Sequence, residues 1–214
     1  LLTGRILGAE ALLRWHHPVR GLLTPDSFLR IAEQSHLINE LDAWVFRRAC
    51  RQAAIWQRQG RSLILAVNLS AGGLHAAGFA ARLAAEVTRM SLVPERLEVE
   101  ITESMLMQDI SRATAQLREL KRLAPGLRVA IDDFGSGYSS LNYLRHLPID
   151  TLKIDRAFVS DLLDPHGAAT ALPIIKTIVD LGHNLNLRVL AEGVETESQA
   201  SELRALGCHD SQGY

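Results

Sequence analysis

The amino-acid sequence predicts an α/β fold, and two observations lead to this prediction. Segments typical of strands alternate with segments typical of helices along the 214 residues. Several strand segments are apolar on both faces, which is typical of a parallel sheet covered by helices. An open doubly wound sheet and a closed (β/α)8 barrel both fit this pattern. No GxGxxG or GxxxxGK[ST] motif follows a strand segment, so we favour a single barrel over a nucleotide-binding fold.

Strands are expected where short apolar runs end at polar or turn-forming residues. Seven segments meet this description, and the last of them, CHDSQGY, shows only the opening of a strand. They cover residues 6–15, 62–70, 96–104, 126–134, 149–155, 187–195 and 208–214.

Helices are expected between these strands, where apolar residues recur at a spacing of three or four. In the segment 38–59, Leu41, Trp44, Val45 and Ala49 follow this spacing. Pro25 suits the first turn of the segment before it. The expected helices cover residues 25–35, 38–59, 79–90, 109–123, 139–147, 156–186 and 197–207.

Composition and charge exclude several classes of protein. The formal net charge is -1, whereas binding to a nucleic-acid polymer needs clustered positive charge. No apolar run approaches the roughly 20 residues of a membrane span, and no signal peptide is visible. Cys50 and Cys208 form no CxxC motif, which favours a reducing compartment. We interpret residues 1–214 as one domain of a longer protein, either cytoplasmic or the cytoplasmic part of a membrane-anchored one.

Polar side chains lie within or at the ends of the apolar strand segments. A buried carboxylate is costly unless it is paired or bound to a cation. In a barrel, the C-terminal ends of the strands converge on one mouth, where active sites lie. Five carboxylates, one amide and one lysine would meet there, namely Glu10, Asn68, Glu100, Asp132, Asp133, Lys153 and Glu192.

This excess of negative charge predicts a bound cation. Ligands that are all oxygen atoms suit Mg²⁺, Mn²⁺ or Ca²⁺ rather than zinc. The adjacent Asp132 and Asp133 suit two metal ions about 3.5–4 Å apart, where one carboxylate bridges both ions and its neighbour binds one. Two-metal sites of this kind hydrolyse phosphate esters. Arg14 lies four residues after Glu10 on the same strand face, where it suits either a phosphate oxygen or a structural ion pair.

Each of these residues alone has an ordinary structural explanation. A single strand glutamate is more often solvent-facing, and an Asp-Asp pair is usually a turn or a helix cap. Glu103, just past its strand, could cap the next helix or brace the DFGSGYSS loop. His16 and His17 are interpreted as loop residues, because no further His or Cys cluster supports a zinc site. The recurrence of polar residues in successive strand segments is what favours a functional site.

A series of motifs resembles one known family. GAEALLRW, VNLS, EITES, IDDFGSGYSSL, LKIDRAFV, AEGVET and QGY occur in this order. Together they resemble the EAL domain family over essentially the whole chain. The resemblance implies a TIM-like (β/α)8 barrel modified with one antiparallel strand, here truncated at both ends. It also implies hydrolysis of the bacterial second messenger cyclic di-GMP to linear pGpG with Mg²⁺ or Mn²⁺, and we expect Ca²⁺ to inhibit.

The resemblance further implies a role for each site residue. One metal would be held by Glu10, Asn68, Glu100 and Asp132, and the second by Asp132, Asp133 and Glu192. Lys153 would orient or activate the water, Glu192 and Glu103 would support catalysis, and Glu103 would anchor the DFGSGYSS loop. Substrate would be bound by Leu13, Arg14, Glu195 and Gln212. EAL domains are similar in pairing through the helices beside this loop, and this resemblance implies a homodimer. It also implies that the full-length chain carries a sensory or GGDEF-like domain.

Two other functions remain open from the sequence. A non-catalytic cyclic di-GMP receptor has the same fold, but such receptors typically lose the EAL glutamate, a metal aspartate or the loop consensus, and this chain keeps them. A Schiff-base aldolase would use Lys153 as its nucleophile. Several carboxylates facing Lys153 favour its charged form, which argues against that chemistry.

Overall fold

The computed structural model describes residues 1, 3–35, 37–135, 143–164 and 166–213. The chain forms two compact units. The first, called the β1 unit here, comprises residues 7–101 and 109–128. The second, called the β6 unit, comprises residues 1–6, 102–108 and 129–214.

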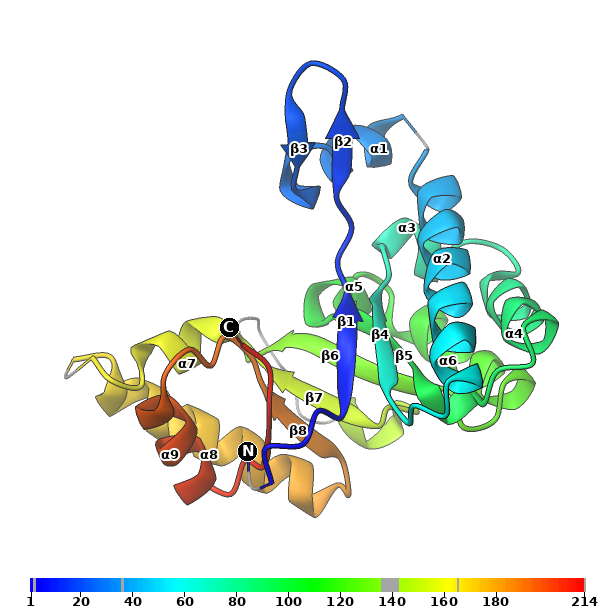
Figure 1. The fold of residues 1–214 in the computed structure, drawn as a ribbon. Coiled ribbons are helices and arrows are strands. Elements are labelled where there is room, and N and C mark those ends of the chain that lie inside the picture. The colour runs from blue at the N-terminus through cyan, green and yellow to red at the C-terminus, as the bar shows by residue number, and fades with distance from the viewer. Residues whose placement is uncertain (2, 36, 136–142, 165, 214) are drawn as a thin grey trace. The chain divides into compact units, whose positions relative to one another are not determined.

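The β1 unit contains three parallel strands in the order β1-β4-β5. Helix α2 packs on β4, and α4 packs on α2 and α6 (Figure 1). The inner side chains are apolar and fully buried, as for Val99, Ile101, Leu117 and Leu120. The elements are β1 (Gly8–Ala11), β4 (Ile64–Asn68), β5 (Leu97–Thr102), α2 (Ile38–Arg58), α3 (Ala71–Leu74), α4 (Phe79–Arg89), α6 (Ile110–Leu123) and the 3-10 turn η2 (Pro94–Arg96).

A small hairpin follows β1, and the sequence did not predict it. The expected strand 6–15 ends at Ala11, and β2 (Trp15–His17) pairs antiparallel with β3 (Gly21–Leu23). The loop interpretation of the two histidines was wrong, because both lie in β2. The His17 Nδ1 atom accepts the N–H groups of Val19 and Arg20, each at 3.1 Å, and so closes the turn. The hairpin leads into η1 (Pro25–Ser27) and α1 (Leu29–Gln34).

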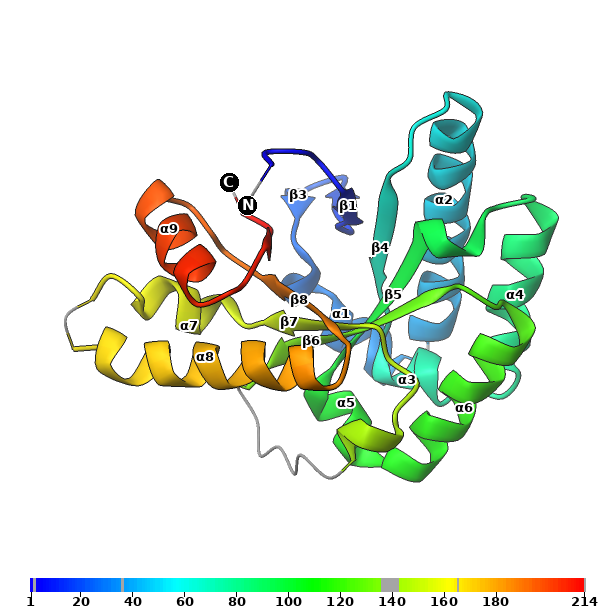
Figure 2. The same ribbon diagram turned by 90° about the horizontal axis from the view of Figure 1, so that it is seen from below.

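The β6 unit contains four parallel strands in the order β6-β7-β8-β9. Helix α8 packs along β7 and β8 (Figure 2). A Cβ on Gly182 would lie 2.2 Å from Val189 Cγ2, so only glycine allows α8 to approach β8 this closely. The elements are β6 (Arg128–Phe134), β7 (Thr151–Ile154), β8 (Arg188–Ala191), β9 (Asp210–Ser211), α5 (Glu103–Gln108), η3 (Leu144–His146), α7 (Arg156–Asp161), α8 (Ala168–Asn184) and α9 (Glu197–Ala205).

Two helix predictions in the β6 unit need correction. The expected helix 156–186 is two helices, because the chain turns between α7 and α8, where the Asp164 carboxylate accepts the N–H of Gly167 at 2.9 Å. The expected helix 139–147 lies partly outside the described residues, and its described end is the short η3 turn. Among the described residues, no helix is both long and apolar enough to cross a membrane. The described strand pairs of both units are parallel, apart from the β2–β3 hairpin.

Candidate functional site

The parallel register of the β6 unit aligns its polar side chains. Lys153 pairs with Leu190, and Glu192 follows Leu190 by two residues, so their side chains share one face. The Ala191 carbonyl accepts the N–H of Gln212 at 2.8 Å, which continues the same ladder. Strand pairing therefore places Lys153, Glu192 and Gln212 at the C-terminal ends of three neighbouring strands.

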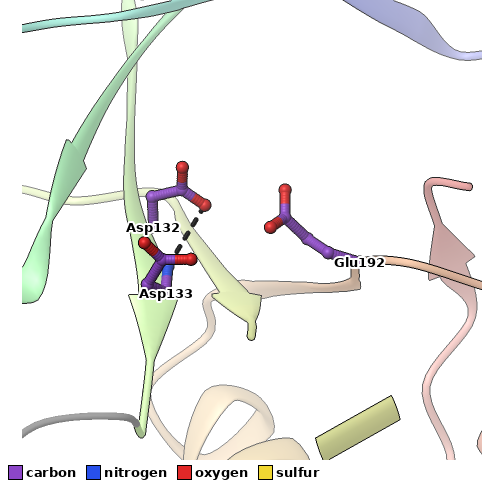
Figure 3. A group of neighbouring side chains, drawn as sticks. All are labelled: Asp132, Asp133 and Glu192. Carbon is purple, nitrogen blue, oxygen red and sulfur yellow. Dashed lines mark hydrogen bonds between the residues drawn. The ribbon is translucent and has the colours of Figure 1, made fainter. Parts of the chain in front are cut away.

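A bulge in β6 explains how two adjacent aspartates serve one site. Successive side chains of a regular strand point to opposite faces. Here the pairing of β6 with β7 shifts register between Ile131 and Phe134, and Asp133 has a left-handed φ of 53°. One oxygen from each of Asp132, Asp133 and Glu192 lies within 4.8 Å of the others (Figure 3). The backbone thus departs from a regular strand where the carboxylates converge.

Lys153 lies between two of these carboxylates. Its side chain is 1% exposed, and its Nζ atom lies 3.1 Å from Asp132 Oδ1 and 2.7 Å from Glu192 Oε1. This position favours the charged ammonium form of Lys153, because each carboxylate stabilises the positive charge. This environment is opposite to the one that a Schiff-base nucleophile requires.

The surroundings of Asp133 disfavour the charged form of its carboxyl. Burial raises the pKa of its carboxyl most, and the charges of Asp132 and Asp155 raise it further. Lys153 and Arg156 lower it, but the net direction is upward. A bound cation would stabilise the ionised carboxylates against their mutual repulsion. These carboxylate oxygens therefore fit a divalent ion that prefers oxygen ligands. Asp132, Asp133 and Glu192 are the residues that would hold it in this unit.

Glu103 lies at the first residue of α5 and contacts the start of the DFGSGYSS loop. Its side chain is buried, and Oε2 accepts the N–H of Gly135 at 3.3 Å. Oε1 accepts a long hydrogen bond from the Tyr143 hydroxyl at 3.4 Å. Glu103 thus contacts Gly135 and Tyr143, the described residues on either side of segment 136–142, which lies outside the described residues. The anchoring role expected for Glu103 remains a prediction that this geometry supports.

Two further predicted residues of the β6 unit lie near β9. The backbone of Gln212 pairs with Ala191 and Val194, at 2.8 and 3.0 Å. The side chain of Glu195 is exposed, and its N–H donates to Gln199 Oε1 at 2.9 Å. The structure therefore does not bring the Glu195 carboxylate to the three-carboxylate cluster by any contact among the described residues. The substrate roles of both residues stay predictions.

The β1 unit presents its own group of predicted ligands. Asn68 pairs with Glu100, and Glu10 pairs with Ala66, which shares a face with Asn68. The Asn68 Nδ2 atom donates to Glu10 Oε1, and the whole Glu100 residue is 1% exposed. An amide that donates to a carboxylate leaves its own oxygen for a cation. These three residues thus lie on one face of β1-β4-β5.

Leu13 and Arg14 follow β1 in the segment that leads to the hairpin. The guanidinium of Arg14 is exposed and donates to the Leu13 carbonyl at 2.7 Å. A solvent-facing guanidinium of this kind can bind a phosphate oxygen. No ion pair with Glu10 is formed by Arg14 among the described residues, so the structural alternative for it loses support.

Sequence reasoning missed two charged residues next to the cluster. Asp155 and Arg156 follow Lys153 in LKIDRAFV, and both influence the Asp133 carboxyl. Asp155 also caps α7 by accepting the N–H of Ala157 at 2.9 Å. Their positions two and three residues after the lysine were the available signal. Segment 149–155 was interpreted as a plain strand, which hid the cap.

Comparison with known proteins identifies the family. The model of the EAL domain matches residues 1–214, so the chain belongs to the EAL domain family. Its α/β fold is the TIM-like fold of that family. A solved structure described as the PaMucR phosphodiesterase in complex with c-di-GMP has a TM-score of 0.90 and 45% identity, over 98% of this chain and 83% of that one.

Curated relatives are considerably longer than this chain. The bifunctional diguanylate cyclase/cyclic di-GMP phosphodiesterase MucR of Pseudomonas aeruginosa is 45% identical over 99% of this chain and 30% of its own length. The cyclic di-GMP phosphodiesterase NbdA of the same organism is 41% identical over 100% of this chain and 27% of its length. The FimX EAL domain of P. aeruginosa, solved bound to c-di-GMP, is 27% identical with a TM-score of 0.85, over 96% of this chain and 80% of that one. The chain thus spans about a quarter to a third of the curated relatives it matches.

Proposed function

We propose that this chain hydrolyses cyclic di-GMP to linear pGpG and so terminates a second-messenger signal. The observation that carries the proposal is the cluster of Asp132, Asp133 and Glu192 around the buried Lys153. Relatives named as cyclic di-GMP phosphodiesterases share 39% to 45% of the sequence. A receptor has no need of three clustered carboxylates and a buried lysine, so these residues favour the enzyme over the receptor.

Metal ions held by carboxylate oxygens would supply charge stabilisation to the phosphate undergoing hydrolysis. In the β6 unit the ligands would be Asp132, Asp133 and Glu192. Glu10, Asn68 and Glu100 remain predicted ligands from the β1 unit. The ion would be Mg²⁺ or Mn²⁺, two per active site.

The protein's own groups would position the reactants. Lys153 holds its protons at Nζ, where the ammonium can donate a hydrogen bond to the attacking water. Asp132 and Glu192 fix the direction of that ammonium. Arg14 offers its exposed guanidinium to a phosphate oxygen, and Glu103 holds the backbone at Gly135. Catalysis would therefore rest on positioning and on charge rather than on a covalent intermediate.

We expect hydrolysis to require Mg²⁺ or Mn²⁺ and to be inhibited by Ca²⁺. The smaller ions favour compact octahedral shells, whereas Ca²⁺ takes longer bonds and more ligands. A misplaced nucleophile can cost on the order of 100-fold in rate. The measurement is the rate of cyclic di-GMP loss with each cation after EDTA treatment. Full activity in EDTA would show that hydrolysis does not require a metal ion.

A homodimer is also part of this proposal, but the structure leaves fewer of the predicted interface residues available for it. Leu144 and Leu147, two of the proposed interface residues, are 3% and 8% exposed and cover the chain's own core. Leu141 lies outside the described residues, and Tyr143 is only partly buried. Sedimentation at several concentrations, together with specific activity, tests the dimer. A monomer with concentration-independent activity would rule out coupling between assembly and catalysis.

The setting proposed for this activity is the cytoplasm, within a signalling protein that also carries a sensory or GGDEF-like domain. MucR is named for both diguanylate cyclase and phosphodiesterase activities. Both cysteines are buried and free, and burial raises the pKa of Cys50 to about 12 and that of Cys208 to about 11. Such thiols are packed as small apolar side chains and fit a reducing compartment.

A further inference from the structure

The β1 unit contains a carboxylate that the proposed reaction does not use. Asp42 lies in α2, and α2 contacts both β4 and α3. Its Oδ2 atom accepts a hydrogen bond from the Ser70 hydroxyl at 2.5 Å. Burial raises the pKa of Asp42 most, and the bond from Ser70 lowers it. Desolvating a carboxylate is costly, so a partly buried carboxylate at this position calls for an explanation.

The hydroxyl of Ser70 acts both as a hydrogen-bond donor and as an acceptor. Its hydrogen is donated to Asp42, and its oxygen accepts the N–H of Gly73 at 2.9 Å as the cap of α3. A serine hydroxyl has one hydrogen to donate. Asp42 therefore determines where that hydrogen points, and with it which lone pair faces Gly73.

Gly73 is the residue that makes room for this arrangement. A Cβ there would lie 2.0 Å from Asp42 Oδ2 and 3.2 Å from Ser70 Oγ. Such close approach excludes every other residue unless the carboxylate moves. Asp42 of α2 thus packs closely against Ser70 and Gly73 at the turn after β4, and we call these three residues the Asp42 corner.

The Asp42 corner begins two residues after Asn68, a predicted metal ligand. Asn68 is the last residue of β4, and pairing with β5 holds the strand on its N-terminal side. The N–H of Leu69 donates to the Glu100 carbonyl at 2.9 Å, after which the ladder stops. On the C-terminal side, the backbone is held by Ser70 and its bond to Asp42. Asn68 therefore lies between the paired strand and the turn that Asp42 contacts.

We propose that Asp42 is a positioning residue for Asn68. Through Ser70 it fixes the turn from β4 to α3, so that the Asn68 amide stays directed to Glu10 and its oxygen stays available to a metal ion. This inference rests on the proposed function, because it assigns a metal-binding purpose to Asn68. Outer partners of metal ligands commonly change metal affinity by about 10- to 100-fold when removed.

The first test measures Mn²⁺ affinity in the absence of cyclic di-GMP, by titration with detection of free Mn²⁺. Asp42→Ala should weaken binding by about tenfold. Asp42→Asn should stay within about threefold of wild type, because its amide oxygen still accepts from Ser70. In a Ser70→Ala background, Asp42→Ala should add no further loss, since the two residues act as one unit.

A matched control separates positioning from general stability. Ala53 is a buried residue of the same helix, about three turns after Asp42, and serves as the control when replaced by glycine. Ala53→Gly should lower the melting temperature and leave Mn²⁺ affinity unchanged. Unchanged affinity in Asp42→Ala would overturn the proposal, as would an equal loss in Ala53→Gly.

The second test needs no metal and follows amide hydrogen exchange in EDTA. Asp42→Ala should speed exchange at the N–H groups of Gly73 and Leu74 and leave the middle of α2 protected. If wild type binds Mn²⁺ but exchange at α3 does not change, only the positioning proposal fails. If wild type binds no Mn²⁺ at all, the metal-dependent function fails and the proposal fails with it.

Discussion

Replacing Lys153 by alanine should lower kcat by at least about 100-fold, the scale of a lost acid–base or positioning group. The buried ammonium contacts Asp132 and Glu192 and is the group placed to orient the water. Substrate affinity should change little, because phosphate binding rests on the metals and on Arg14. Lys153→Arg should rescue poorly, since a planar guanidinium does not fit the place of a compact ammonium. The measurement is kcat and KM of each variant at saturating Mn²⁺.

A matched control is available for the lysine experiment. Lys176 also pairs with an aspartate, Asp180, but both side chains are about half exposed on α8. Lys176→Ala should leave kcat unchanged, because exposed pairs contribute little. Lys153→Met removes the charge and keeps the volume, which separates lost chemistry from lost packing. A near wild-type kcat in Lys153→Ala would contradict the water-positioning role and leave Glu192 as the next candidate for the base.

Replacing Asp133 by asparagine should abolish turnover without weakening the fold. Asparagine tolerates the left-handed backbone at this residue, whereas alanine would add strain there. Removing one negative charge from a crowded cluster relieves repulsion. Glu10→Ala should likewise abolish turnover. Melting in EDTA should show both variants no less stable than wild type, and a large loss of stability would indicate structural roles.

The difference in stability between Asp133→Asn and wild type should also depend on pH. The folded-state pKa of Asp133 is raised, so the native protein binds a proton more readily than the unfolded chain does. Wild type therefore loses stability as pH rises from the unfolded pKa through the folded one. In EDTA, Asp133→Asn should melt higher than wild type near pH 7, and the difference should vanish below about pH 4. Asp180→Asn, an exposed change on α8, should show no such trend.

The sequence allowed the strands and the polar residues at their ends to be predicted, for identifiable reasons. The strands of β4, β5, β6 and β7 are apolar runs that end in turn-forming or charged residues. Because parallel strands share one C-terminal edge, the expectation that Asp132, Lys153 and Glu192 lie together needed only the strand order. In the structure, Lys153 Nζ lies 3.1 Å from Asp132 and 2.7 Å from Glu192.

Features that depend on backbone geometry were not predictable from periodicity. The β-bulge at Asp133 changes the direction of a side chain, but the sequence IDDF does not distinguish a bulged strand from a regular one. The segment from Ile6 to Trp15 has one continuous apolar pattern, so the end of β1 at Ala11 and the new hairpin at Trp15 were hidden. The break between α7 and α8 had a signal in Asp164 and Gly167, which favour a turn.

Product analysis of cyclic di-GMP incubated with the protein and Mn²⁺ tests the proposed hydrolysis most directly. We expect cyclic di-GMP to disappear and linear pGpG to appear in equal amount. EDTA should stop the reaction, and Lys153→Ala should bind substrate with little turnover. Binding of cyclic di-GMP by wild type with no pGpG formed would contradict the proposed hydrolysis, and would identify the chain as a receptor instead.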